Sequence, residues 1–161
     1  MHDRVIGPYF FKNGEGEAIT VNGERYRYMI DTFLRPAVNA IDNHHSLCFQ
    51  QDGATCHTAR QTMDNLRQIF GNQIISCGGD INWPSRSPDL TALDFFLWRY
   101  LKERVSINKP WTVDALKQNI TDEIRGISQA TLCVVMDNVL LRAQSCIAAQ
   151  SQYLSDVVLH M

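Results

Sequence analysis

The alternation of hydrophobic and polar positions along the chain predicts strands that alternate with helices. Residues 5–11 (VIGPYFF) and 17–21 (EAITV) have the pattern of two short strands around the turn residues 13–16. A helix is expected from about Glu24, because apolar side chains recur there at helical spacing. Pro36 is expected to kink or restart this helix, since proline cannot donate the hydrogen bond of a helix interior.

A third strand and a second helix are expected around Asp52. In residues 46–52 (SLCFQQD), strand alternation places Cys48, Gln50 and Asp52 on one face, with Asp52 at the carboxyl end. Cys48 is expected in the core. Thr58 is expected to cap a following helix, whose apolar positions are Ala59, Met63, Leu66, Ile69 and Phe70.

The second half of the chain has the pattern of one short strand followed by helices. The strand is expected near residues 73–76, and a loop stiffened by two prolines follows it. The clearest helix covers residues 93–105, and another is expected to start after Thr112. A longer helix carries an apolar stripe at Leu132, Val135, Met136, Val139, Leu140 and Ala143. Strands that alternate with helices predict an α/β fold.

The composition is that of a folding globular domain, with 161 residues, 45% hydrophobic and 20% charged. A net charge of -2 excludes a strongly basic nucleic-acid clamp, although it allows a local basic patch. We expect no apolar run of bilayer-spanning length, and neither a membrane nor a small-molecule substrate as partner. The five cysteines form no C-x-x-C pair, which predicts free thiols in an intracellular protein.

Two carboxylates occupy positions at which metal ligands are common. Asp52 ends a strand, where open α/β sheets place ligands, and Asp94 opens a helix on the flank of its apolar stripe. Two such carboxylates can bind Mg²⁺ or Mn²⁺ for phosphoryl transfer. On spacing alone a structural interpretation is the more common one, with Thr91-x-x-Asp94 as a capping box and Asp52-Gly53 as a strand exit.

Two longer blocks resemble the signature blocks of mariner-type transposases. They are QQDGATCHTA at 50–59 and WPSRSPDLTALDFFLW at 83–98. The segments IGPYFF (6–11) and VNGERY (21–26) resemble parts of insect members of the same group, so the resemblance covers most of residues 5–125. It implies a DDE-superfamily endonuclease of DNA transposition that acts in the nucleus on DNA, with Mg²⁺ or Mn²⁺ as cofactor. The implied fold is RNase H-like, a mixed sheet flanked by helices.

The resemblance assigns roles to particular residues. Asp52 is the second of three catalytic, metal-binding acidic residues, and Asp94 is the third. His57 is a near-site candidate, because the family block also carries histidine there. The interval of 41 residues between the two aspartates is longer than in the commonest mariner branch. Ser85 and Ala92 replace prolines that the family usually carries.

The resemblance also implies that the family's first acidic residue is missing. That residue lies well upstream of the IGPYFF segment, and Asp3 is too close to Ile6 to match it. We therefore expect residues 1–110 to be a truncated RNase H-like catalytic domain, an incomplete fold without the opening strand or the N-terminal DNA-binding region. Residues 111–161 are expected to be its C-terminal helical extension.

Such a chain is expected to bind metal weakly and to be catalytically inactive alone. The alternative is a non-enzymatic interaction module or an expressed relic, which forms a homo-oligomer or pairs with full-length transposase subunits.

Four basic residues near Asp94 are candidate phosphate contacts. Arg86 lies in the stiff loop, and Arg99, Lys102 and Arg104 lie on the helix that follows. The helix residues alternate with apolar positions, so a solvated helix face is the alternative interpretation.

Overall fold

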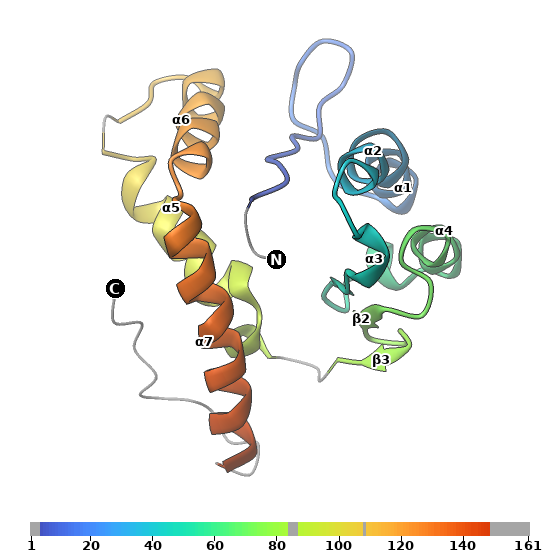
Figure 1. The fold of residues 1–161 in the computed structure, drawn as a ribbon. Coiled ribbons are helices and arrows are strands. Elements are labelled where there is room, and N and C mark those ends of the chain that lie inside the picture. The colour runs from blue at the N-terminus through green and yellow to red at the C-terminus, as the bar shows by residue number, and fades with distance from the viewer. Residues whose placement is uncertain (1–3, 84–86, 108, 149–161) are drawn as a thin grey trace. The chain divides into compact units, whose positions relative to one another are not determined.

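The computed structural model describes residues 4–83, 87–107 and 109–148. The chain divides into two compact units. The strand unit comprises residues 9–86, and the helical unit comprises residues 1–8 together with residues 87–161. Figure 1 shows the elements of both units. The boundary predicted between residues 110 and 111 falls inside the helical unit.

The first helical segment of the strand unit is long and is interrupted by a π turn. Its parts are α1 (Gly23–Met29), the π turn η1 (Ile30–Leu34) and α2 (Arg35–Asn39). Pro36 lacks the N–H group that an α-helix needs at this point. The wider π turn ends just before Pro36, and in it the N–H of Arg35 donates to the carbonyl of Ile30. Where the sequence predicts a kink at Pro36, the helix therefore changes from a π turn to an α-helix.

Three short strands form a parallel sheet in the order β1-β2-β3. They are β1 (Phe49–Gln50), β2 (Ile74–Ser76) and β3 (Ile81–Asn82). The register pairs Phe49 with Ile74 and Ile75 with Ile81. Gly79 is needed between β2 and β3, because a Cβ there would lie 2.6 Å from the carbonyl oxygen of Ile74. The first two of these strands were predicted, and β3 was not.

Two helices follow β1, and a 3-10 turn precedes it. They are α3 (Thr55–Thr58), α4 (Arg60–Phe70) and the turn η2 (His44–Ser46). The predicted cap at Thr58 is wrong, because Thr58 ends α3 and the extended residue Ala59, with ψ 136°, separates the two helices. The hydroxyl of Thr62 donates to the carbonyl of Cys56 at 2.9 Å and ties α4 to α3.

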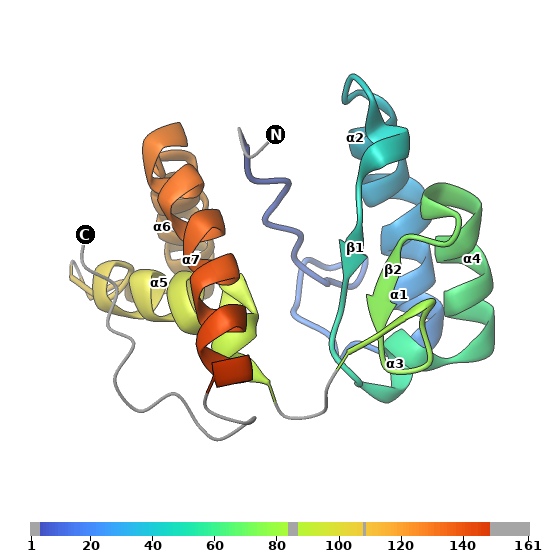
Figure 2. The ribbon, with the colours of Figure 1, turned by 60° about the horizontal axis from the view of Figure 1, so that its bottom comes forward.

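The core of the strand unit lies between these helices and the sheet. Figure 2 shows α1, α2 and α4 on one side of β1 and β2. The buried side chains are Tyr26, Ile30, Val38, Met63, Leu66, Phe70 and Ile74. Of the apolar positions predicted for this helix, Met63, Leu66 and Phe70 are buried and Ile69 packs against the core, whereas Ala59 precedes α4.

The strand alternation around β1 is as predicted, but the prediction that Cys48 is buried is wrong. Leu47 and Phe49 pack against the core, and Gln51 is buried. Because alternate residues of a strand point to opposite faces, Cys48 and Asp52 lie on the other face and are exposed.

The two strands predicted within residues 5–21 do not form. In the described part of this segment, a single antiparallel bridge pairs Lys12 with Ala18. The predicted turn is present, because the side-chain oxygen of Asn13 accepts from the N–H groups of Glu15 and Glu17. A two-stranded ribbon without a third strand is marginal, so the segment remains a loop.

The helical unit contains the helices that the sequence predicts after residue 90. The elements are η3 (Pro88–Leu90), the π turn η4 (Leu93–Leu97), α5 (Trp98–Arg104), α6 (Val113–Arg125) and α7 (Gln129–Ala148). The Thr112 side chain accepts from the N–H of Ala115 at 3.1 Å and caps α6. Leu101, Val105 and Ile124 form the core between α5 and α6.

Helix α7 is apolar but largely exposed. Its buried residues are Val135 and Arg142, whereas Leu140 and Leu141 are 66% and 56% exposed. An 18-residue window of this 20-residue helix has a mean hydropathy of 1.2, and the helix is long and apolar enough, by length and composition, to cross a bilayer. The expectation that no run reaches this length is therefore wrong.

We predict that Leu66→Ala destabilises the strand unit by about 2–5 kcal/mol, because Leu66 is fully buried and truncation leaves a cavity. The matched control Leu140→Ala should change stability by less than about 0.5 kcal/mol, since this leucine is exposed. Urea unfolding followed by far-ultraviolet circular dichroism measures both. Equal losses from the two variants would contradict the packing described above.

Candidate functional site

Asp52 lies two residues beyond the end of β1 and is oriented by two donors. Its Oδ1 accepts a hydrogen bond from the N–H of Ala54 at 3.0 Å and another from Nδ1 of His57 at 2.5 Å. Because an ionised carboxylate can only accept, the His57 proton lies on Nδ1. The Asp52 side chain is 72% exposed, so its second oxygen is accessible to solvent.

His57 is in turn supported by two buried side chains. The Gln51 amide donates from Nε2 to the carbonyl of His57 at 3.1 Å, and the Tyr26 hydroxyl donates to Oε1 of Gln51 at 3.1 Å. The rings of Tyr26 and His57 lie 4.3 Å apart between centroids, at 36° to one another. A chain of contacts thus runs from α1 through the end of β1 to Asp52.

Sequence reasoning did not identify Tyr26 or Gln51 as part of the site. The signal available for Gln51 was its position, because an alternation that points Asp52 outward points the preceding amide inward. Nothing in the sequence indicated that Tyr26, 25 residues upstream of Gln51, would be its partner.

The surroundings of Asp52 favour its charged form. Partial burial acts to raise the pKa of Asp52, but the hydrogen bonds from Ala54 and His57, together with the charge of His57, outweigh it and lower the pKa. Burial, followed by the nearby Cys56 and Asp52, raises the pKa of Tyr26. Tyr26 therefore stays protonated at physiological pH and can donate to Gln51.

Asp94 lies in the helical unit, on the π turn η4, and is exposed. Its N–H donates to the carbonyl of Thr91 at 2.9 Å, while the Thr91 hydroxyl donates to the carbonyl of Ser87 at 3.3 Å. The cap position belongs to Ala92, without a side-chain hydrogen bond, so the capping box suggested by Thr91-x-x-Asp94 does not form. Asp52 and Asp94 belong to different units, and their convergence stays a prediction.

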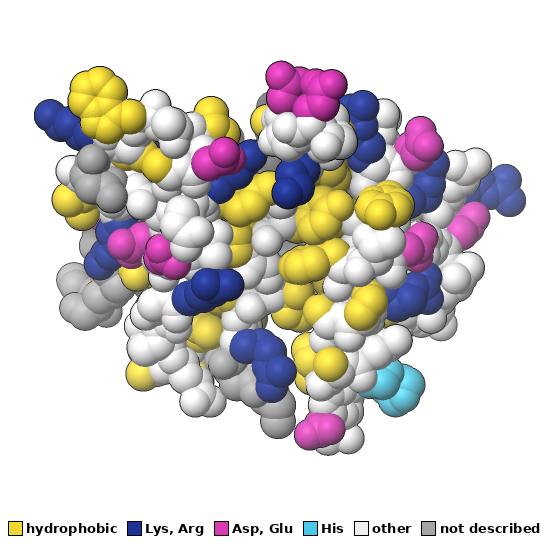
Figure 3. All heavy atoms as spheres, turned by 90° about the horizontal axis from the view of Figure 1, so that it is seen from above, with side chains coloured by type: hydrophobic (Ala, Val, Ile, Leu, Met, Phe, Trp, Pro, Cys, Tyr) yellow, Lys and Arg dark blue, Asp and Glu magenta, His cyan; other side chains and the backbone are white. Residues whose placement is uncertain are grey.

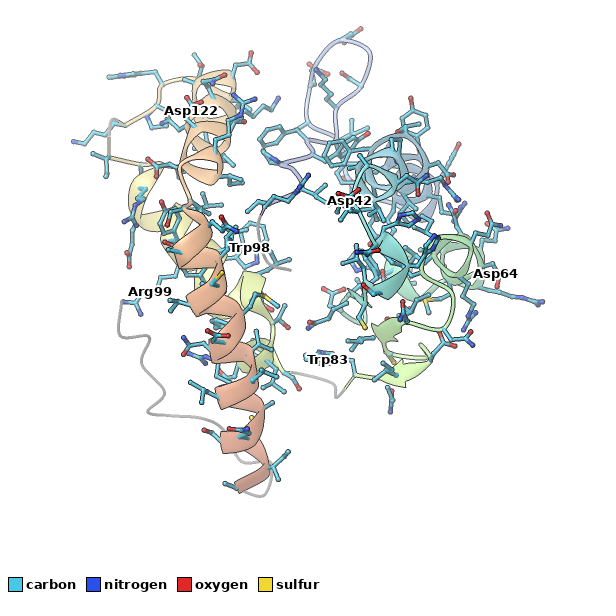
Figure 4. The ribbon with its side chains drawn as sticks, viewed as in Figure 1. Asp42, Asp64, Trp83, Trp98, Arg99 and Asp122 are labelled. Carbon is cyan, nitrogen blue, oxygen red and sulfur yellow. The ribbon has the colours of Figure 1, made fainter. Side chains whose placement is uncertain are left out.

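The basic residues of α5 are engaged with acidic and aromatic neighbours. Arg99 pairs with Glu103 at 3.0 Å and points away from the helix (Figure 4). Arg104 lies over the Tyr100 ring at 3.9 Å and pairs with Glu123 at 3.7 Å. Lys102 is exposed, and Arg86 lies outside the described residues. These pairings favour a solvated face for Arg99 and Arg104, and the DNA contacts stay a prediction.

The donor groups do not complete a metal centre. Across residues 4–83, 87–107 and 109–148, no three Asp, Glu, His or Cys side chains gather at a distance suited to one ion. The strand unit offers Asp52 and His57, and Oδ1 of Asp52 already accepts two hydrogen bonds. Because two divalent ions need several anionic ligands between them, this set does not fit a two-ion centre.

We predict that Asp52→Asn removes a small, pH-dependent contribution to the free energy of unfolding. The lowered pKa means that the carboxylate stabilises the fold above about pH 4, and that this contribution is lost as the pH falls through the pKa of the folded state. Because the side chain is exposed, the effect should stay below about 1 kcal/mol. Urea unfolding at pH 7 and pH 3 measures it, and a difference between the two proteins that is the same at both pH values would contradict it.

Comparison with known proteins finds a relative by sequence and solved structures of similar fold. No family model matches the chain. The Tc3 transposase of Caenorhabditis elegans is 38% identical over 81 residues, which cover 49% of this chain and 22% of that protein. The chain therefore corresponds to a small part of the length of this relative.

Solved structures of Mos1 transposase have a similar fold. The Mos1 catalytic domain has a TM-score of 0.79 at 19% identity, over 96% of this chain and 72% or 73% of that chain in two structures. It has been solved with raltegravir and either Mg or Mn. The Mos1 paired-end complex with Mn has a TM-score of 0.72 at 20% identity, over 84% of this chain and 38% of that chain. The sequence match and the shared RNase H-like α/β fold show that the chain is homologous to the mariner/Tc1 transposases.

Proposed function

We propose that this chain is a DNA-binding part of a mariner-type transposase, in which Asp52 and Asp94 are the second and third acidic residues. The observation that supports this most is the position of Asp52 at the carboxyl end of β1, within the QQDGATCHTA block and with its carboxylate held by His57. The nucleus is the compartment in which such a protein would meet its DNA.

We further propose that the chain does not cleave or transfer DNA strands by itself. Two aspartates and one histidine give too few anionic ligands for a pair of divalent ions. The ion that we propose is Mg²⁺ or Mn²⁺, bound weakly, because both prefer carboxylate oxygens. The net charge of -2 also limits the number of phosphates that the chain can neutralise, so DNA binding should be weak.

A second candidate function is an interaction module that pairs with another transposase subunit or with a second copy of this chain. The observation that favours it is the exposed apolar surface of α7, which includes Val134, Leu140, Leu141 and Ile147. Apolar surface of this kind on a helix is typical of protein–protein interfaces. This function needs no metal and no third acidic residue.

We predict that the chain binds duplex DNA with a modest salt dependence. Each phosphate neutralised contributes about -0.9 to the slope of log K against log salt, so the four candidate basic residues predict a slope of about -3 to -4. Fluorescence anisotropy of a labelled duplex, measured between about 50 and 200 mM salt, gives this slope. The double variant Arg99→Gln, Lys102→Gln should reduce the magnitude of the slope by about 2.

The same preparation should leave supercoiled plasmid intact in Mg²⁺ or Mn²⁺. A metal-dependent nick that disappears in Asp52→Asn would contradict the proposed absence of cleavage. Absence of any salt-dependent DNA binding would contradict the proposed binding function and would favour the interaction module.

We predict that the double variant Leu140→Gln, Leu141→Gln abolishes self-association of the chain. The substitutions replace exposed apolar side chains by polar ones on α7, so they should remove an interface with little effect on folding. Sedimentation velocity over a range of protein concentrations measures the oligomeric state. The control Ile107→Ser alters an exposed apolar residue outside α7 and should leave it unchanged. An unmutated chain that stays monomeric throughout would contradict the prediction for a second copy.

A further inference from the structure

The loop that replaces the predicted hairpin encloses a cavity together with α1. This cavity has a volume of about 450 Å³ and lies entirely within the strand unit. Its lining includes the aromatic residues Tyr9, Phe11 and Tyr28 and the basic residues Lys12 and Arg25. Figure 3 views the molecule from the side of this loop and shows hydrophobic side chains bordered by Lys and Arg side chains. The Asp52 site does not use any of these residues.

Two of the aromatic rings that line the cavity differ in their packing: Tyr9 contacts neighbouring rings, whereas Tyr28 is exposed. Tyr9 packs edge-on against Phe11, with centroids 5.0 Å apart, and lies 5.2 Å from the ring of Phe33. These contacts hold Tyr9 in place. The side chain of Tyr28, on α1, is 63% exposed and can take a planar group against its ring.

The polar groups of the cavity are of two kinds. Nη1 of Arg25 donates to the carbonyl of Thr20 at 2.6 Å, which holds the guanidinium near the rim, and its other N–H groups can donate to an anion. Lys12 adds a second cation and has no ion pair with the described residues. Asn22 and Glu24 also line the cavity and offer an amide and a carboxylate. Cations thus lie beside groups that can hydrogen-bond to the edge of a base.

We propose that this cavity binds a single unpaired nucleotide of DNA, with its base against Tyr28 and its phosphate against Arg25 and Lys12. The volume lies within the range of about 300–1,000 Å³ found for small-ligand sites, so it is large enough for one nucleotide. Aromatic rings beside basic groups are the usual means by which proteins hold single strands. The inference rests on the proposed DNA-binding function and adds a preference for unpaired bases at a place separate from Asp52.

The consequence is a difference between two forms of DNA. A duplex has to unstack a base before that base can enter, whereas a single strand does not. We therefore expect Tyr28 to contribute to the binding of an oligothymidylate and to contribute little to the binding of a blunt duplex.

Fluorescence anisotropy with a labelled oligothymidylate and with a blunt duplex tests the inference. The oligothymidylate has about 15 nucleotides, which is of the order of one single-strand binding site. Tyr28→Leu should weaken oligothymidylate binding about tenfold and leave duplex binding unchanged, because it removes one base-stacking surface. Tyr28→Phe should bind as the unmutated chain does, since it retains the ring. Arg25→Gln should weaken single-strand binding and reduce its salt slope by about 1. The control Trp98→Leu alters another exposed aromatic residue, in the helical unit, and should change neither affinity.

The possible outcomes separate this inference from the proposed function. Duplex binding with no effect of Tyr28→Leu on the oligothymidylate would overturn the nucleotide site and leave the proposed function standing. Failure of both DNA forms to bind would overturn both. Comparing the circular dichroism of Tyr28→Leu with that of Tyr28→Phe shows whether both variants are folded. If both are folded and bind the oligothymidylate with equal affinity, the inference is also overturned.

Discussion

The site in the strand unit depends on the hydrogen bonds of the buried Gln51 amide. The amide accepts from the hydroxyl of Tyr26 on α1, donates to the carbonyl of His57 on α3, and directly follows β1. Buried polar groups are costly without partners, so this amide constrains three separate parts of the chain at once. The direction of α3, and with it the position of His57, follows from this constraint.

The two acidic residues differ in how well they are prepared for a ligand. Asp52 is oriented by His57 and by the Ala54 N–H, and its pKa is lowered, so its charge and direction are established before anything binds. Asp94 is exposed on a π turn, and its carboxylate has no hydrogen bond to the residues that the structure describes. Asp52 is therefore preorganised within the strand unit, whereas Asp94 is not held by a side-chain contact in the helical unit.

Two exposed surfaces point to partners rather than to chemistry. Helix α7 exposes leucines and an isoleucine, and the loop ahead of α1 forms an aromatic and basic cavity. The apolar helix suits another polypeptide, whereas the cavity suits a planar anion such as a nucleotide. Both are compatible with the similarity to transposases, among whose solved structures is the Mos1 mariner paired-end complex.

The sequence by itself determined the main helices, the first two strands of the sheet and the resemblance to transposases. Helical spacing predicts α4 through Met63, Leu66 and Phe70, and α6 through its cap at Thr112, because these signals are local and each agrees with the burial that follows. The QQDGATCHTA block is likewise local, and it is the basis for proposing Asp52 as a site residue. Only the tertiary structure decided that residues 5–21 form a loop, since a strand requires a neighbour that sequence pattern alone cannot supply. It also decided that Tyr26 and Gln51 support His57, because such a contact joins residues 25 positions apart and depends on how α1 packs against the end of β1.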